Sequence, residues 1–231
     1  MNTTINPSEL EKFKTHANAW WDKEGPLQTL HDINPTRLAF VKENCKLDGL
    51  QLLDIGCGGG VFSEALAQAG ASVVGLDAEE GAIHTAVAHA QETGVKLEYV
   101  CSAIELYQHA AFDVITCMEL LEHVENFELV IAHAARLLKP QGLLFLSTMN
   151  RTFKAYLSAI VAAEYVLSIL PRQTHDFSQF IRPSELLRVL RRHGFELVSL
   201  KGMRYNPFTR EASLCDETDV NYLLAVRFQG L

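Results

Sequence analysis

The chain has 231 residues, of which 48% are hydrophobic and 21% are charged, with 7 prolines and 14 glycines. These values are typical of a globular domain and exclude collagen, coiled-coil arrays and wholesale disorder. The formal net charge of −8 argues against non-specific nucleic-acid binding, so nucleic acid is not an expected partner. We therefore expect a single domain over residues 1–231.

The cysteines and the apolar segments indicate where the protein works. There are five scattered cysteines, an odd number without a C-x-x-C pair, as expected in a reducing cytosol. The first residues show no basic stretch followed by an apolar run, and no apolar stretch reaches the length of a membrane span. The sequence therefore predicts a cytoplasmic protein.

The elements are expected in the following chain order. Helices over residues 8–23 and 36–44 would form an N-terminal helical cap, residues 1–45. Strands over 51–55, 72–77, 96–101, 112–117 and 143–148 alternate with helices over 61–69, 81–92 and 127–138. Short apolar strands that alternate with helices indicate a parallel sheet covered on both faces.

The last third breaks this alternation. A helix over 183–192 precedes a strand over 196–200, and no helix is evident before the final strand, 220–228. Two strands without a crossover helix must be antiparallel. The predicted fold is therefore α/β and Rossmann-like, with a seven-stranded, mostly parallel sheet that ends in an antiparallel hairpin.

A glycine-rich turn, Asp54-Ile-Gly-Cys-Gly-Gly-Gly60, follows the first expected strand. Glycines let the backbone approach a ligand, and the next helix offers free N–H groups. Asp77 ends the second strand, where nucleotide-binding folds place an acid that binds ribose. Val61 departs from the NAD fingerprint, so this pattern favours S-adenosylmethionine (SAM) over an NAD-dependent oxidoreductase. A structural tight turn with a solvated Asp77 is the alternative.

A second group of polar residues, Glu119, Glu122 and His123, follows the fourth strand. Ligands bind beyond the carboxyl ends of the strands in such sheets. If this segment were helical, the three side chains would share one face. They would then form either a general-base cluster or a set of ligands for a hard cation. A helix start that carries acids favoured by the dipole is the alternative.

Several motifs together resemble the ubiquinone biosynthesis O-methyltransferase family of class I SAM-dependent methyltransferases, from about residue 10 to 228. Besides the glycine turn they are Trp20-Trp-Asp22, His31-Asp-Ile-Asn-Pro-Thr-Arg37, Cys117-Met-Glu-Leu-Leu-Glu-His-Val124, Thr148-Met-Asn-Arg151, Glu164-Tyr165, Thr174-His-Asp176 and Asp219-Val-Asn-Tyr222. The chain departs from the family pattern at Gln141, where Gly is usual, and at Met149, where Leu is common.

The resemblance implies a role for each matching residue. The cofactor SAM would be bound by Arg37 through its carboxylate, by Gly56 and Gly58 in the loop, by Asp77 through the ribose hydroxyls, and by Met118 in the pocket wall. Glu122 and His123 would be catalytic, and Glu119, Glu122 and His123 match positions that the family uses for a divalent cation, usually Mg²⁺. For Arg37, a solvated position on a helix is the alternative.

The resemblance also implies the substrate. It would be a polyprenylated phenol or quinol, methylated as a 2-polyprenyl-6-hydroxyphenol and again as 3-demethylubiquinol. Other small-molecule or lipid methyltransferases remain alternatives, as does a non-catalytic protein that binds lipid surfaces. The sequence does not determine whether the protein joins a complex of ubiquinone-biosynthesis enzymes.

An apolar and basic insertion, residues 151–192, suits such a substrate. Residues 151–210 hold ten bases and four acids, and residues 156–170 are unusually apolar. This composition is typical of an element that lies on an anionic membrane surface without spanning it. We expect peripheral association with the inner face of the membrane, and the alternative is a cap or lid over the active site.

Overall fold

A computed structural model of the chain describes residues 3–15, 19–109, 111–157 and 177–230. The central part of the predicted insertion, with the Glu164-Tyr165 and Thr174-His-Asp176 motifs, lies outside these residues. Of the helices that the structure describes, none is long and apolar enough to cross a membrane.

The N-terminal region contains α1 (Pro7–Lys14) and α2 (Gln28–Asn44). α1 starts after Asn6, whose side chain accepts hydrogen bonds from the backbone N–H groups of Ser8 and Glu9. α2 begins well before the expected position and contains Pro35. The helix that was expected to start at residue 36 therefore starts upstream of Pro35, and packing of Ile33, Phe40 and Val41 against the sheet outweighs the proline inside it.

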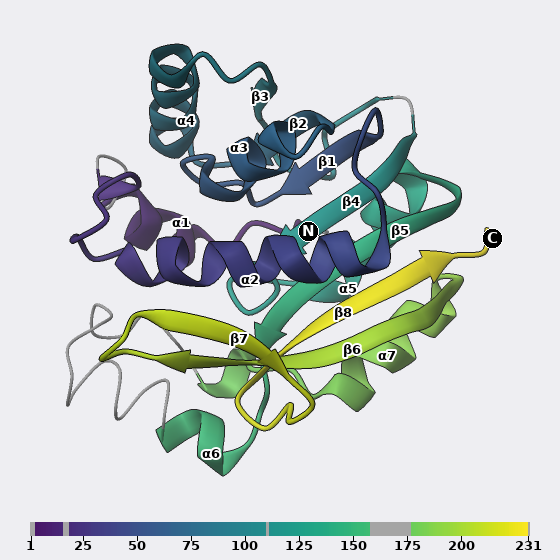
Figure 1. The fold of residues 1–231 in the computed structure, drawn as a ribbon. Coiled ribbons are helices and arrows are strands. Elements are labelled where there is room, and N and C mark those ends of the chain that lie inside the picture. Colours follow the sequence, from purple (N-terminus) through teal and green to yellow (C-terminus); the bar gives the residue numbers. More distant parts are fainter. Residues whose placement is uncertain (1–2, 16–18, 110, 158–176, 231) are drawn as a thin grey trace.

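Eight strands form the sheet, in the order β3-β2-β1-β4-β5-β8-β6-β7 (Figure 1). Their bounds are β1 Gln51–Ile55, β2 Ser72–Asp77, β3 Glu98–Cys101, β4 Phe112–Met118, β5 Leu138–Met149, β6 Phe195–Asn206, β7 Glu211–Cys215 and β8 Asn221–Phe228. β1 to β5 pair in parallel, while β8 lies antiparallel between β5 and β6. The predicted parallel sheet with antiparallel C-terminal strands is confirmed.

The predicted count of seven strands is wrong by one. β7 pairs antiparallel with the second half of β6, Gly202–Asn206, and adds an eighth strand at the edge. Its five residues are exposed or half-buried, so they lack the apolar run that marked the other strands.

Helices cover both faces of the sheet, as Figure 1 shows for α2 and α3 in front and α5 and α7 behind. The covering helices are α3 Val61–Gln68, α4 Glu80–Thr93, α5 Phe127–Leu137 and α7 Pro183–Arg192, and a short α6 spans Phe153–Ala155. Side chains of β1 alternate between two cores, because Leu52 packs with α2 and α3 while Leu53 packs with α5 and α7. This alternation is the period of two that a strand buried on both faces requires.

Gln141 occupies a backbone position with φ of 66°. A left-handed conformation favours glycine, because any other residue brings its Cβ close to the following carbonyl oxygen. The side chain of Gln141 donates a hydrogen bond to that of Gln229 at 2.8 Å. This geometry explains why glycine suits the position and how glutamine is accommodated there.

Candidate active site

The glycine turn lies between β1 and α3, at the carboxyl edge of the sheet. Gly56, Gly58 and Gly60 have φ of 72°, 53° and 86°, in the left-handed region that side chains disfavour. The N–H of Gly58 donates to Asp77 Oδ2 at 2.8 Å, and Asp77 Oδ1 accepts from the N–H of Glu79 at 2.9 Å. Asp77 is therefore fixed beside the turn and is not a freely solvated acid.

The N-terminal segment packs directly on this turn. A Cβ at Gly58 would lie 2.3 Å from a ring carbon of Trp20, so only glycine fits beneath the indole. Trp21 donates its ring N–H to the carbonyl of Gly59 at 2.8 Å and stacks on His89, with ring centroids 3.3 Å apart. The two tryptophans thus form a roof over the glycine turn, which explains their place in the motif.

Asp54 is buried beneath the turn. Its carboxylate accepts hydrogen bonds from Ser63 Oγ at 2.6 Å and Thr116 Oγ1 at 2.7 Å. Burial raises its pKa to about 6, although these bonds and the charge of Arg37 act in the opposite direction. The acid of the motif therefore ties β1 to α3 and β4.

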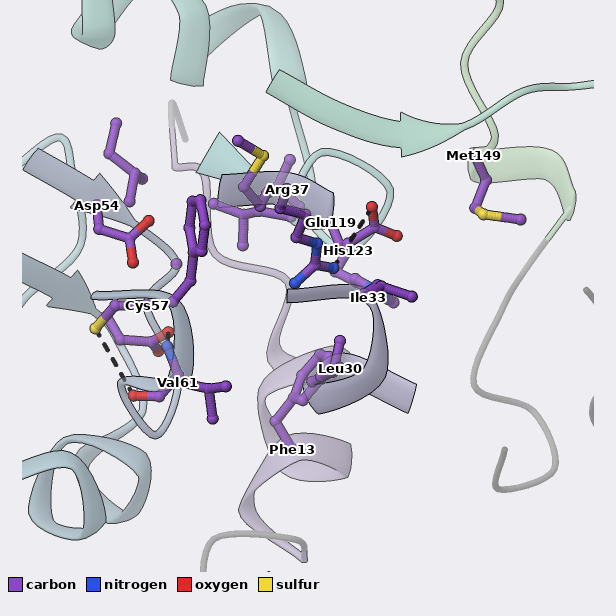
Figure 2. A pocket seen from close by; sticks show the side chains of 18 of the residues that line it. Phe13, Leu30, Ile33, Arg37, Asp54, Cys57, Val61, Glu119, His123 and Met149 are labelled. Atoms are coloured by element: carbon purple, nitrogen blue, oxygen red, sulfur yellow. Dashed lines mark hydrogen bonds and ion pairs between the residues drawn. The ribbon is translucent and has the colours of Figure 1, made fainter. Parts of the chain in front are cut away.

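Arg37 of α2 and Glu119, which follows β4, form an ion pair in the wall of the cavity (Figure 2). Arg37 Nη2 lies 3.6 Å from Glu119 Oε1, and the arginine is 5% exposed. Among the described residues, Arg37 Nε and Nη2 and Glu119 Oε1 have no hydrogen-bond partner. Buried charged groups without hydrogen bonds are costly, so this pair is arranged to receive a ligand with complementary polar groups.

Glu119 holds its position at the expense of backbone strain. Its φ is 53°, and its N–H donates to both the carbonyl and the hydroxyl of Ser147, at 3.1 and 3.0 Å. Non-glycine residues in this region cost about 1–3 kcal/mol and gather at functional sites.

The segment that follows Glu119 is a turn, so the helical arrangement considered from the sequence is wrong. His123 lies at the cavity, where its Nδ1 is 2.8 Å from Glu9 Oε2. Glu122 lies behind the wall, is 5% exposed, and accepts a hydrogen bond from Thr148 Oγ1 at 2.7 Å. Burial and the charge of Glu119 raise the pKa of Glu122, against the effects of His123 and Thr148.

One cavity of about 820 Å³ joins these features. This volume lies in the upper part of the range of small-molecule sites. Seven of the eight predicted site residues line it, namely Arg37, Gly56, Gly58, Asp77, Met118, Glu119 and His123, whereas Glu122 does not. The cavity extends to Met149, Lys154 and Val220, next to the described ends of the insertion.

The predicted ligands for magnesium are not brought together. Within the described ranges, no group of three or more His, Cys, Asp or Glu side chains is arranged to hold a metal ion. Glu119 faces Arg37, Glu122 faces Thr148, and His123 faces Glu9. These three side chains, as they are placed, do not fit a cation site.

Sequence reasoning missed Glu9 and the contact of Trp20 with the glycine turn. Glu9 is 114 residues from His123, and no local pattern connects residues so far apart. The double tryptophan was a visible signal, but nothing in its spacing showed which element it covers.

The strand order, the glycine turn and the acid that ends β2 define a class I methyltransferase fold. A family model described as a methyltransferase domain matches residues 27–200. The magnesium protoporphyrin IX methyltransferase of Synechocystis PCC 6803, solved with bound S-adenosylhomocysteine (SAH), superposes with a TM-score of 0.70 at 21% identity, over 94% of each chain. The cyclase SpnF superposes with a TM-score of 0.69 at 16% identity, over the full length of both chains. At these identities the structures establish the fold alone.

Sequence relatives identify the family more narrowly. The ubiquinone biosynthesis O-methyltransferase of Azoarcus sp. (strain BH72) is 48% identical over 100% of both chains. The enzyme of the same name from Methylococcus capsulatus is 47% identical over 96% of this chain and 95% of its own. The chain belongs to the ubiquinone biosynthesis O-methyltransferase family, whose members are SAM-dependent enzymes.

Proposed function

We propose that this enzyme transfers the methyl group of SAM to a hydroxyl of polyprenylated catechols, both the 2-polyprenyl-6-hydroxyphenol type and 3-demethylubiquinol. The observation that carries the proposal is a single cavity lined by Asp77, by His123 and by Arg37, whose Nε and Nη2 have no hydrogen-bond partner among the described residues. One end offers groups for a nucleoside and an amino acid, and the same space holds a base for a phenol. The relatives' names support the pathway.

The cofactor would occupy the side of the cavity next to the glycine turn. Asp77 would accept hydrogen bonds from the ribose hydroxyls, and Arg37 would bind the carboxylate of the methionine part. Gly56 and Gly58 would let the ligand approach the backbone, and Met118 would pack against it. Arg37 Nε and Nη2 would then gain the partners that they lack among the described residues.

A catechol hydroxyl must lose its proton when it is methylated. Its pKa is near that of a tyrosine phenol, about 10, so it is mostly protonated at neutral pH. His123 is the imidazole that lines the cavity beside Glu119, and it would accept this proton, an effect typically worth about 10²–10⁴-fold in rate. Glu122 does not line the cavity, so it would act through its charge on His123.

Magnesium is a prediction of the resemblance that the side chains, as placed, do not support. We expect methylation to continue at the wild-type rate in buffer stripped of metal by a chelator, since His123 is at hand to accept the proton. Loss of turnover that added Mg²⁺ restores would contradict this expectation, while unchanged SAH affinity in the same samples would show that the cofactor site is intact.

The substrate assay uses the full chain with methyl-labelled SAM. Short-prenyl analogues of the two catechols should accept one methyl group each, and matched phenols that lack the neighbouring hydroxyl should accept none. Quinone profiling of a deletion strain should show demethylated intermediates. Methylation of unrelated small molecules or lipids, with none on the catechols, would identify a different methyltransferase. Binding to lipid without any methyl transfer would identify a non-catalytic protein.

We also propose that the face around α6 contacts the membrane from the cytoplasmic side. Phe153, Tyr156 and Leu157 are 74%, 38% and 44% exposed, and large apolar side chains that gather on a surface mark interaction sites. The cavity reaches this face at Lys154 and Met149, which suits a substrate with a lipid tail.

Several basic residues of this region are paired with acids. Arg151, Lys154, Arg192, Lys201 and Arg204 form ion pairs with acids of neighbouring segments. Arg191 and Arg192 end α7, whereas its first turn lies beside α6 through the Arg151–Glu185 pair. We therefore attribute the membrane contact mainly to the apolar side chains.

Sedimentation with anionic and with zwitterionic vesicles tests this contact. We expect the double substitution Phe153→Glu and Leu157→Glu to reduce pelleting at least about tenfold. The two apolar side chains would be buried in the membrane on binding, and burial of each is worth roughly 1.5–3 kcal/mol. Leu106→Glu is the matched control, since Leu106 is 73% exposed and lies in the connection between β3 and β4, outside the face around α6. Equal, negligible pelleting of wild type with both vesicles would make this face an active-site cap only.

A further inference from the structure

The two tryptophans that cover the glycine turn differ in the state of their ring N–H groups. Trp21 donates its N–H to the carbonyl of Gly59 at 2.8 Å. Trp20 is 8% exposed, and its Nε1 is buried without a hydrogen-bond partner among the described residues. A buried donor that lacks an acceptor is costly. Because Trp20 also lines the cavity, a ligand in the cavity can supply the acceptor.

The indole of Trp20 is held in place by residues of three helices. The carbonyl of Trp20 accepts a hydrogen bond from His31 Nε2 of α2 at 2.8 Å. The side chain packs with Leu27 and with Ala82 of α4. The ring of Phe13, in α1, stacks on the indole with centroids 6.5 Å apart. The N–H therefore has a fixed direction before a ligand binds, which reduces the entropy lost on binding.

The contacts of the indole lie on both sides of Asp77. Its benzene ring covers Gly58, whose N–H donates to Asp77 Oδ2 at 2.8 Å. Ala82 lies in the first turn of α4, which begins after Glu79, and the N–H of Glu79 donates to Asp77 Oδ1 at 2.9 Å. The part of the cofactor nearest to Trp20 is therefore the part that Asp77 would bind, the ribose.

The ribose hydroxyls need a hydrogen-bond donor as well as an acceptor. A hydroxyl has one proton and two lone pairs, so a hydroxyl that donates to Asp77 can still accept a hydrogen bond. The backbone N–H groups of the turn that already have acceptors within the protein are those of Gly56, Cys57, Gly58 and Gly60. These groups are not free to bind the ribose. An indole N–H can only donate, so Trp20 matches what the hydroxyl lacks.

We infer that Trp20 is a cofactor-binding residue: its ring N–H donates a hydrogen bond to a ribose hydroxyl of SAM or SAH. The inference rests on the placement of the cofactor in the proposed function. It gives the ribose two protein partners of opposite kind, the acceptor Asp77 and the donor Trp20. The N-terminal segment then covers the glycine turn and also binds the cofactor.

The first test measures SAH binding by calorimetry. Trp20→Phe removes the N–H and keeps an aromatic ring, so it should weaken SAH binding by about 3- to 10-fold, the loss expected for one neutral hydrogen bond. The loss should disappear for either 2′-deoxy-SAH or 3′-deoxy-SAH, because one of these analogues lacks the acceptor. Unchanged affinity for SAH, or an equal loss for SAH and both analogues, would overturn the inference.

Trp21→Phe is the matched control. It removes a ring N–H whose acceptor is the carbonyl of Gly59 and not a ligand. Any change in affinity that it causes should therefore be the same for SAH and for both analogues.

NMR of the wild-type protein supplies a readout that does not depend on the folding of Trp20→Phe. The chain has two tryptophans, so a ¹⁵N–¹H spectrum contains two indole signals, which Trp21→Phe assigns. On addition of SAH the Trp20 signal should move downfield and its N–H should exchange more slowly with water. An unchanged signal and exchange rate would overturn the inference, as would a response to a short-prenyl catechol alone and not to SAH. Neither measurement uses methyl transfer, so an enzyme that methylates no catechol would refute the proposed substrate and leave this test in force.

Discussion

Gly58 lies directly beneath Trp20, and replacing it with alanine tests the roof over the glycine turn. The new Cβ would lie 2.3 Å from a carbon of the indole, so the ring must leave its place. Trp20 is 8% exposed, and loss of a buried tryptophan costs about 3–5 kcal/mol. The left-handed φ of 53° adds about 1–2 kcal/mol for any side chain. We expect Gly58→Ala to lower the free energy of unfolding by about 4–7 kcal/mol.

Two comparisons separate these contributions. Gly49 has a φ of 72° and open space around its Cβ direction, so Gly49→Ala should cost only the backbone strain of about 1–2 kcal/mol. In a Trp20→Ala background the clash disappears, and Gly58→Ala should cost the same small amount. Urea unfolding of the four variants of this cycle gives a coupling of about 3–5 kcal/mol. Equal costs of Gly58→Ala in both backgrounds would refute the packing of Trp20 on the turn.

Two further predictions concern the acids of the turn. Asp77→Ala should weaken SAH binding by about 1–3 kcal/mol, because a charged acceptor for the ribose is lost. Calorimetry measures the affinity, with Asp216→Ala as the control at an exposed acid. Unchanged affinity of Asp77→Ala would contradict the assignment of Asp77 to the ribose. The pKa of Asp54 is raised from 3.8 to about 6, so the folded state binds this proton more tightly than the unfolded chain does. The stability that Asp54 contributes therefore falls as the pH rises from about 4 to 6. The difference is about 3 kcal/mol over the whole range and about 2 kcal/mol between pH 4.5 and 7.5, so Asp54→Asn should remove about 2 kcal/mol of the change in unfolding free energy between these two pH values; parallel pH curves for the two proteins would contradict this.

The parts of the fold that the sequence predicts well are those with local signals. β1, β2 and α5 follow the expected ranges because each is an apolar run or an amphipathic repeat with polar residues or glycine at its ends. β7 was missed because it is short and has two core-packed side chains, Ala212 and Leu214, in place of an apolar run; its pairing with β6 makes it a strand.

The site shows the same division between local and distant information. The places of Gly56, Gly58 and Asp77 in the fold could be predicted from the local pattern, because one strand–turn–helix unit and the next strand hold them. Glu122 was grouped with Glu119 and His123 on the assumption that this segment is helical. The segment is a turn, and it directs the side chain of Glu122 behind the cavity wall. The direction in which such a side chain points depends on how whole elements pack together. Spacing along the chain does not encode that packing.

The roof formed by the N-terminal segment has a consequence for synthesis on the ribosome. α1 and the two tryptophans leave the ribosome before their partners, which include Gly59, His89 and His123, and the most distant of these is made more than a hundred residues after Glu9. A helix of eight residues is marginal by itself in water. This segment therefore waits for the parallel half of the sheet before it can order, and the cavity is completed only when it folds back onto the strands made after it.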